Sequence, residues 1–257
     1  MFIREHSKGR PFGAAAALAA GVILTGLSLA PGRAAAGEDF AAIFGGKYAE
    51  AERFLGRNAW IEPALQLPTD ETRIALAVVF PEILRFNALE DEMQVRGLKV
   101  LYVQSGRAYM NFSVGRFQMK PSFVEHIESD YNRLFTAGEK AAAGIPAFEP
   151  GDTSVLREKR VLRLDELAWQ VRYLGLFMWV MKKRYGHIVF SDVEDRLRFY
   201  ATAYNAGYAS GETALRRKME ERRFHIALLL PKSTYNYADV ALFYFRRRDG
   251  SAGGTIK

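Results

Sequence analysis

Residues 198–211 read RFYATAYNAGYASG, an aromatic helical pattern that stops within a few residues. Up to Tyr204, apolar and aromatic side chains recur at the spacing of one buried helix face. Asn205 interrupts the pattern, and Gly207 then supplies the residue type that most easily lets a chain leave a helix. In isolation, this segment predicts a helix that ends in a polar cap. Whether the Asn205 amide also binds a ligand depends on the sequence around it.

The sequence on both sides of this segment is mostly helical in pattern. The longest such stretch, residues 163–186, is broadly apolar and ends in Lys-Lys-Arg and Gly186, which signal a helix C-terminus. A helix that is apolar on most of its surface is expected to be central and buried. In 69–80 the helical pattern runs into Pro81, which we expect to end or kink it. Further helical patterns cover 39–58, 122–135, 192–208 and 235–248.

Two stretches depart from the helical pattern. Residues 98–112 place β-branched and aromatic residues on both sides of Ser-Gly, which predicts a short β-hairpin. Residues 138–154 are rich in Gly, Pro and Ala and are expected to form a surface loop. Without an internal repeat or a break in composition, residues 37–245 are predicted to form one mainly α domain, followed by a flexible C-terminal tail over 246–257.

Composition favours a folded domain and gives little support for nucleic-acid binding. Hydrophobic residues make up 49% and aromatic residues 13% of the 257, enough to bury a substantial core. The net charge is +7, of which the first 36 residues contribute +3 and leave +4 for the rest. So small an excess, without a nucleic-acid motif, argues against a nucleic-acid partner. An anionic cell-wall polymer or a membrane surface would suit this net positive charge as well as a nucleic acid does.

The N-terminus has the pattern of a secretion signal. Basic residues between positions 4 and 10 precede an apolar run over 12–30, and small residues follow up to Ala36. This order predicts a signal peptide over 1–36 and an exported, periplasmic or envelope-associated protein without a permanent membrane anchor. The alternative is an uncleaved anchor, because a run of 19 residues approaches the length that spans a bilayer. The chain has no cysteine, which excludes a lipid-anchored lipoprotein, disulfides and thiol chemistry.

Four segments that follow one another in order link this chain to a known family. They are Glu82 at the end of a helical pattern, 115–119 within SVGRFQMKPSF, 203–207 within the segment quoted first, and 230–240 within LLPKSTYNYADV. Together they resemble the lytic transglycosylases of bacterial cell walls, in the soluble-transglycosylase (SLT) branch of the lysozyme-like fold. The resemblance spans roughly residues 70–245. It implies a lysozyme-like helical domain, here with the predicted β-hairpin as an insertion.

The resemblance implies an enzyme that cleaves the β-1,4 bond between N-acetylmuramic acid and N-acetylglucosamine in peptidoglycan. Glu82 would act as general acid and then as base, and the muramoyl C6 hydroxyl would close a 1,6-anhydro ring without water. The apolar residues on both sides of Glu82 in the sequence are of the kind that raises the pKa of a carboxyl group. No second acid stands near the other motifs, as a two-carboxylate glycosidase would require.

The same resemblance implies that residues in the later motifs bind substrate: Gln118, Met119, Tyr204, Asn205 and Tyr237. Amides bind N-acetyl and hydroxyl groups, and tyrosine rings stack on sugars. Each residue also has a structural alternative, since Gln118 could cap a helix and the tyrosines and Met119 could belong to the core. No cofactor is implied, and the four histidines lack the spacing of a metal site. The expected partner is the peptidoglycan glycan strand.

Three departures from the family pattern leave two other functions open. Ile83 follows the glutamate where the family has serine, Ser233 stands where it has glutamate, and the interval from Glu82 to Gln118 is longer than usual. These differences indicate a divergent branch and admit a murein-binding or scaffold module without catalysis. The other alternative is a goose-type lysozyme, which shares the fold and hydrolyses the same bond with water.

Overall fold

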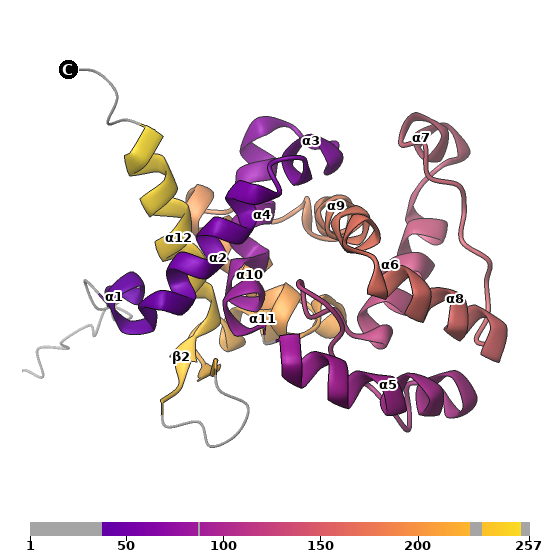
Figure 1. The fold of residues 1–257 in the computed structure, drawn as a ribbon. Coiled ribbons are helices and arrows are strands. Elements are labelled where there is room, and N and C mark those ends of the chain that lie inside the picture. The colour runs from indigo at the N-terminus through magenta and orange to yellow at the C-terminus, as the bar shows by residue number, and fades with distance from the viewer. Residues whose placement is uncertain (1–37, 87, 227–232, 253–257) are drawn as a thin grey trace, which may run out of the picture. The chain divides into compact units, whose positions relative to one another are not determined.

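The structure is a computed structural model that describes residues 38–86, 88–226 and 233–252. The expected signal segment, 1–36, lies outside the described residues, and so do residues 227–232, which begin the last of the four motifs. The described part is mainly helical, as predicted, and contains one small antiparallel sheet (Figure 1). Its elements are α1 (Phe40–Phe44), α2 (Gly46–Arg57), α3 (Ile61–Ala64), α4 (Thr69–Arg85), α5 (Ala88–Ser105), α6 (Pro121–Leu134), α7 (Ala137–Ala142), α8 (Ser154–Asp165), α9 (Leu167–Tyr185), α10 (Val193–Ala206), the 3-10 turn η1 (Tyr208–Ser210), α11 (Glu212–Lys218), β1 (Arg222–Phe224), β2 (Tyr235–Asn236) and α12 (Tyr237–Ala252).

The core forms where α4 meets α10 and α12, which lie beside it in Figure 1. Every residue of α4 from Ile74 to Leu84 is buried. Phe80 of this helix stacks on Tyr244 of α12, with ring centroids 3.9 Å apart. A helix buried on all sides must satisfy or neutralise any polar side chain that it carries. Glu82 is such a side chain, and its surroundings decide its chemistry.

The second buried helix is α9, as its sequence predicts. It spans 19 residues and packs against α6, α8, α3 and α4. Gly175 lies where this helix approaches the end of α3, and a Cβ atom at this position would lie 2.9 Å from the carbonyl oxygen of Leu65. The glycine therefore permits a close approach that a larger residue would prevent.

The helix that contains Pro81 does not end there. α4 continues to Arg85, although proline removes one N–H from the helix and crowds the carbonyl group four residues earlier. In the same turn, the Tyr237 hydroxyl of α12 donates a hydrogen bond to the Val78 carbonyl at 2.9 Å. This bond adds a contact from α12 to the turn, although the carbonyl that loses its helical donor at Pro81 is that of Ala77. Of the two expected outcomes at Pro81, an end or a kink, the end of the helix is therefore wrong.

The predicted β-hairpin over 98–112 is also wrong, because most of this stretch is helical. α5 runs to Ser105, and the chain turns at Gly106 with a φ of +79°. α5 packs against α8, and Tyr102 is buried there with its hydroxyl donating to Glu125 at 2.7 Å. Strand propensity depends strongly on context, so the β-branched residues of this stretch adopt the conformation that buries Tyr102.

Three smaller features also differ from the expectations. Residues 138–154 contain the short helix α7, whose N-terminus is a capping box, instead of loop alone. α12 extends to Ala252, beyond the expected domain end at 245, and Arg246 in the extension pairs with Glu194 of α10. The observed sheet is formed by β1 and β2, which pair antiparallel just before α12.

Replacement of Gly175 by alanine is expected to destabilise the domain. The new methyl group meets the Leu65 carbonyl at a distance that requires α9 or the Leu65 segment to move. We expect the free energy of unfolding, measured with urea, to fall by about 1–3 kcal/mol. Gly56→Ala in α2 is the control, because a Cβ atom there meets nothing within 4 Å and alanine favours a helix. Equal effects of the two substitutions would contradict the close approach.

Candidate active site

A cavity of about 480 Å³ lies beside the last turn of α4. Its walls also include residues from the segment between α5 and α6, the first turns of α6, the end of α10 and η1. Five of the six residues predicted as site residues line this cavity: Glu82, Gln118, Met119, Tyr204 and Asn205. Segments that are far apart in the sequence therefore share one cavity.

Glu82 lies in the last turn of α4, and its side chain is 4% exposed. This burial raises the pKa of the Glu82 carboxyl above its ordinary value of 4.5. The nearby negative end of the α4 dipole acts in the same direction. The charges of Arg85 and Lys120 act in the opposite direction. Because the net shift is upward, the protein favours the neutral, proton-carrying form more than water does.

Arg85, three residues after Glu82 in α4, forms an ion pair with it. Its Nη2 atom lies 2.6 Å from Oε2 of Glu82. The guanidinium group also lies over the ring of Phe224, 5.6 Å from the ring centroid. Arg85 lines the cavity together with Glu82, so a bound ligand can contact both members of the pair.

Residues 114–119 form a tight loop that carries Gln118 and Met119. Val114 and Met119 form an antiparallel bridge, with N–O distances of 2.9 and 3.2 Å. Gln118 has a φ of +48°, a conformation that is costly for a residue other than glycine. Its side-chain amide donates to the Gly115 carbonyl at 2.9 Å, which helps to hold this conformation.

Gln170 of α9 holds the same loop from the inside. Its Nε2 atom donates to the Leu164 carbonyl at 2.6 Å, and its Oε1 atom accepts from the backbone N–H of Phe117 at 2.9 Å. Gly115 leaves room for this amide, because a Cβ atom there would lie 1.8 Å from Nε2 of Gln170. Residues 115–119 form the motif G-x-x-Q-M. Its glycine, Gly115, is therefore needed because Gln170 of α9, a distant helix, occupies the space of a Cβ atom.

The end of α10 brings the motif of residues 203–207 to the cavity. The helix ends before Gly207, which has a φ of +88°. Tyr204 is buried, and its hydroxyl donates to the Phe117 carbonyl at 2.8 Å, so it joins α10 to the 114–119 loop. Asn205 is exposed at the helix end and lines the cavity.

Tyr237 is placed differently from the other five residues. It is buried at the start of α12 and lines a neighbouring cavity of about 210 Å³, to which Asn205 also contributes. Tyr237 also contributes to lowering the pKa of Glu82, against the larger effect of burial, while its hydroxyl proton is donated to the Val78 carbonyl. Its position therefore fits contact with Glu82 better than contact with a ligand in the larger cavity.

Six polar residues that line the cavity have no signal of their own in the sequence: Asn111, Ser113, Lys120, Ser122, His126 and Ser210. The first four lie close to the G-x-x-Q-M motif, so proximity to that motif is the one available clue. Ser122 and His126 are four residues apart in α6 and so lie on one face of it. Amides and hydroxyls in this lining suit a neutral, polyhydroxylated ligand.

Among the described residues that line the cavity, Glu82 is the one carboxylate. No group of three or more His, Cys, Asp or Glu side chains in the described part of the chain could hold a metal ion. The arrangement supports proton transfer by one carboxyl group, with the cations Arg85 and Lys120 close to it.

Comparison of the chain with family models, with curated proteins and with solved structures finds no match. None of the helices within the described ranges is long and apolar enough to cross a bilayer. The functional assignment therefore depends on the sequence motifs and on the geometry of the cavity.

The raised pKa of Glu82 predicts a pH-dependent stability that Glu82→Gln removes. The folded protein holds this proton more tightly than the unfolded chain, so the stabilisation is lost as the pH rises above 4.5. The free energy of unfolding of the wild type, relative to the Gln variant, should therefore fall as the pH rises through and above 4.5. Arg85→Met, which removes the ion pair, should enlarge this fall. A difference that rises with pH would show that the ion pair outweighs burial.

Proposed function

We propose that this protein is a peptidoglycan lytic transglycosylase with a lysozyme-like helical domain. The supporting observation is that Glu82, the one carboxylate among the described lining residues, is buried with a raised pKa beside a cavity of amides and hydroxyls. A raised pKa favours the protonated form that a general acid requires, and the other groups suit a sugar. The motifs around Gln118 and Asn205 line the same cavity, which is the arrangement that the resemblance implies.

The proposed reaction has two steps. The protonated Glu82 carboxyl gives its proton to the glycosidic oxygen while the bond between that oxygen and C1 of N-acetylmuramic acid breaks. N-acetylglucosamine leaves with the proton on its O4 hydroxyl, and the N-acetyl carbonyl oxygen of the muramoyl group stabilises the positive charge at C1. The C6 hydroxyl then attacks C1, and its proton returns to the Glu82 carboxylate. Because the attack is intramolecular, high effective molarity replaces an incoming water.

Arg85 affects the two steps in opposite ways. Between the steps Glu82 is negatively charged, and the guanidinium group 2.6 Å away stabilises this charge. Before the first step, the same ion pair opposes protonation. The upward shift of the Glu82 pKa indicates that burial outweighs the ion pair, as a general acid requires.

The remaining site residues have three roles in this proposal. Gln118 and Asn205 hydrogen-bond the N-acetyl and hydroxyl groups of the sugar. Met119 and Tyr204 are buried and shape the cavity wall, while Tyr237 orients the Glu82 carboxyl.

The proposed partner is the glycan strand of peptidoglycan, without a nucleic acid and without a cofactor. The signal pattern over 1–36 supports export to the periplasm or cell envelope, where this substrate occurs. Cleavage of that segment would leave the enzyme without a permanent membrane anchor.

One observation favours a second candidate, a murein-binding module without catalysis. A buried carboxylate that forms an ion pair at 2.6 Å is also what a purely structural role would require. Ile83 in place of the family's serine points in the same direction. A goose-type lysozyme is distinguished from both by its product, because water would then attack C1 and leave a reducing end.

Glu82→Gln is expected to lower the turnover of purified murein sacculi by about 10²–10⁴-fold. The amide keeps the shape of the side chain but cannot deliver a proton. The melting temperature should stay close to that of the wild type, because the site already favours a neutral group. Mass spectrometry of the wild-type products should find 1,6-anhydro ends. Reducing muramic-acid ends would indicate a lysozyme, and binding without release would indicate the non-catalytic module.

The matched control is Glu50→Gln, an exposed position on α2, which should keep full turnover. A folded Glu82→Gln variant that retains more than about a tenth of the wild-type turnover would remove Glu82 from catalysis. Early melting with a proportional loss of activity would instead assign Glu82 a structural role with Arg85.

Asn205→Ala is expected to lower kcat/KM about tenfold, the effect of losing one hydrogen bond to the substrate. Because Asn205 is exposed, the melting temperature should not change. Gln104→Ala, at an exposed position of α5 outside the cavity lining, is the control. Equal kinetics of the two variants would exclude Asn205 from substrate binding.

A further inference from the structure

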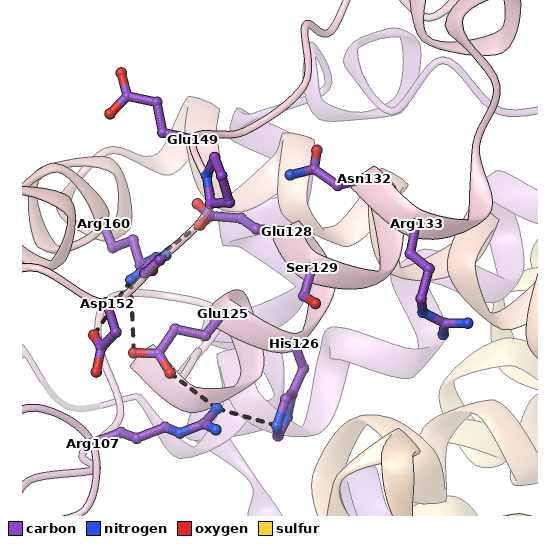
Figure 2. Close-up of a pocket in the computed structure, with 12 residues that line it drawn as sticks. Arg107, Glu125, His126, Glu128, Ser129, Asn132, Arg133, Glu149, Asp152 and Arg160 are labelled. Atoms are coloured by element: carbon purple, nitrogen blue, oxygen red, sulfur yellow. Dashed lines mark hydrogen bonds and ion pairs between the residues drawn. The ribbon is translucent and has the colours of Figure 1, made fainter.

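Most arginines of the described residues are neutralised by a carboxylate. A second cavity of about 480 Å³, formed by α6, α8 and the segments before them, shares His126 with the candidate active site and illustrates this pairing. Figure 2 shows Arg107 and Arg160 directed at carboxylates of the same cavity. Arg160 donates to Glu128 at 2.7 Å, and Arg107 contacts Glu125 at 3.0 Å. The charges of this cavity therefore satisfy one another.

The exposed face of α2 is different, because its cations lack such partners. Arg53 and Arg57 are four residues apart, so they lie on one face of the helix, and both are exposed. Lys47 is exposed in the first turn of the same helix. In the described part of the chain, none of these three side chains takes part in an ion pair. Their positive charges are therefore met by solvent alone.

A fourth cation reaches this face from the 114–119 loop. The guanidinium carbon of Arg116 lies over the ring of Phe54 in α2, 4.9 Å from the ring centroid, and over the ring of Phe86 at 4.2 Å. Two aromatic contacts fix the guanidinium group beside α2 without neutralising its charge. Within the described ranges, Arg116 has no ion pair either. We call Lys47, Arg53, Arg57 and Arg116 together the α2 face.

Acidic residues offset this charge only in part. Of the two acids of α2, Glu52 pairs with Arg247 of α12 at 3.4 Å, and Glu50 is spaced to lie on the same side as Arg53 and Arg57. Four cations against one carboxylate leave a net charge of +3. By contrast, Arg246, Arg247 and Arg248 of α12 each pair with an acid. The α2 face thus concentrates positive charge that the fold leaves unpaired.

Exposed apolar side chains stand at both ends of α2, where Figure 1 shows α1 and α3. Ile43 of α1 and Trp60, just before α3, are each 43% exposed. The Trp60 indole N–H donates to Asn58 Oδ1 at 3.1 Å, so its polar atom is satisfied while the ring stays exposed. Tryptophan favours the interface between a bilayer and water, and cations beside it favour anionic headgroups.

The place of α2 in the chain favours the same partner. The apolar run of residues 12–30 precedes α1 by only nine residues. Because a signal of the predicted kind enters the bilayer during export, α1 and α2 are the first helices to emerge beside the membrane.

We propose that the α2 face binds the anionic headgroups of a phospholipid bilayer. The phosphate oxygens accept hydrogen bonds from the four cations, and the Trp60 ring lies among the headgroups. Arg116 belongs to the loop that carries Gln118, so this loop joins the α2 face to the wall of the candidate active site. The inference does not depend on the proposed function.

Co-sedimentation with lipid vesicles tests this inference. Residues 39–257 form one compact unit, so the test uses residues 37–257, which lack the apolar run that would bind lipid by itself. We expect binding to vesicles of phosphatidylglycerol mixed with phosphatidylcholine, weakening as salt is added, and little binding to phosphatidylcholine alone. Equal binding to both kinds of vesicle would overturn the proposal. So would an oligothymidylate that binds the α2 face more tightly than the anionic vesicles do.

A double variant locates the binding. Arg53→Gln with Arg57→Gln should weaken vesicle binding about thirtyfold, roughly fivefold for each charge lost at the surface. Both side chains are exposed, so the fold should persist. The control is Arg172→Gln with Arg217→Gln, which removes the same charge from exposed positions of α9 and α11. Equal weakening by the two double variants would assign the binding to net charge and overturn the proposal.

Trp60 supplies a second readout that a loss of charge would not give. Vesicles of phosphatidylglycerol and phosphatidylcholine should shift the tryptophan emission to shorter wavelength as the ring leaves water. Trp60→Ala should abolish this shift and weaken binding about tenfold. A shift that persists in Trp60→Ala would place the contact elsewhere and overturn the proposal.

The Arg53→Gln and Arg57→Gln double variant should digest murein sacculi at the wild-type rate, because neither residue lines the candidate active site. Vesicle binding without any cleavage of murein would support the α2 face and reject the proposed enzyme. Cleavage of murein without vesicle binding would reject the α2 face and leave the enzyme in place.

Discussion

The burial of α4 is the constraint on which the rest of the site depends. Because every residue from Ile74 to Leu84 is buried, the carboxyl group of Glu82 is removed from water together with its apolar neighbours. Burial raises the pKa of this carboxyl, and Arg85 limits the rise by an ion pair in the same helix. Tyr237 approaches from α12, where its hydroxyl also bonds to the backbone of α4 at Val78. The chemistry of Glu82 therefore follows from how the helices pack.

The walls of the cavity are held by contacts between helices and one irregular loop. Gln170 of α9 bonds to the backbone of Phe117 from one helix, and Tyr204 of α10 bonds to it from another. These two bonds explain how Gln118 is kept in an unfavourable backbone conformation. α6 then lines both large cavities, with His126 in the wall of each.

Features that depend on spacing within one segment were predictable from the sequence. The mainly helical fold, the central position of α9 and the turn at Gly207 follow from apolar periodicity and from the backbone freedom of glycine. The apolar neighbours of Glu82 indicated the direction of its pKa shift, because residues adjacent in a buried helix are buried together. The motif residues Gln118 and Asn205 could be named in advance, although their lining of one cavity with Glu82 could not be read from spacing.

Features that depend on groups from distant segments were decided only by the tertiary structure. Residues 98–105 are helical instead of a hairpin strand because α8 and Glu125 offer Tyr102 a buried place and a partner. α4 passes through Pro81 in a turn where α12 supplies a hydrogen-bond donor. The positions of two further residues also depend on how distant segments pack. Tyr237 lies in a neighbouring cavity, and His126 lines the proposed site. The sequence determines which local conformations are favourable, but a buried polar group or a strained turn is stable only when its partner arrives from elsewhere in the fold.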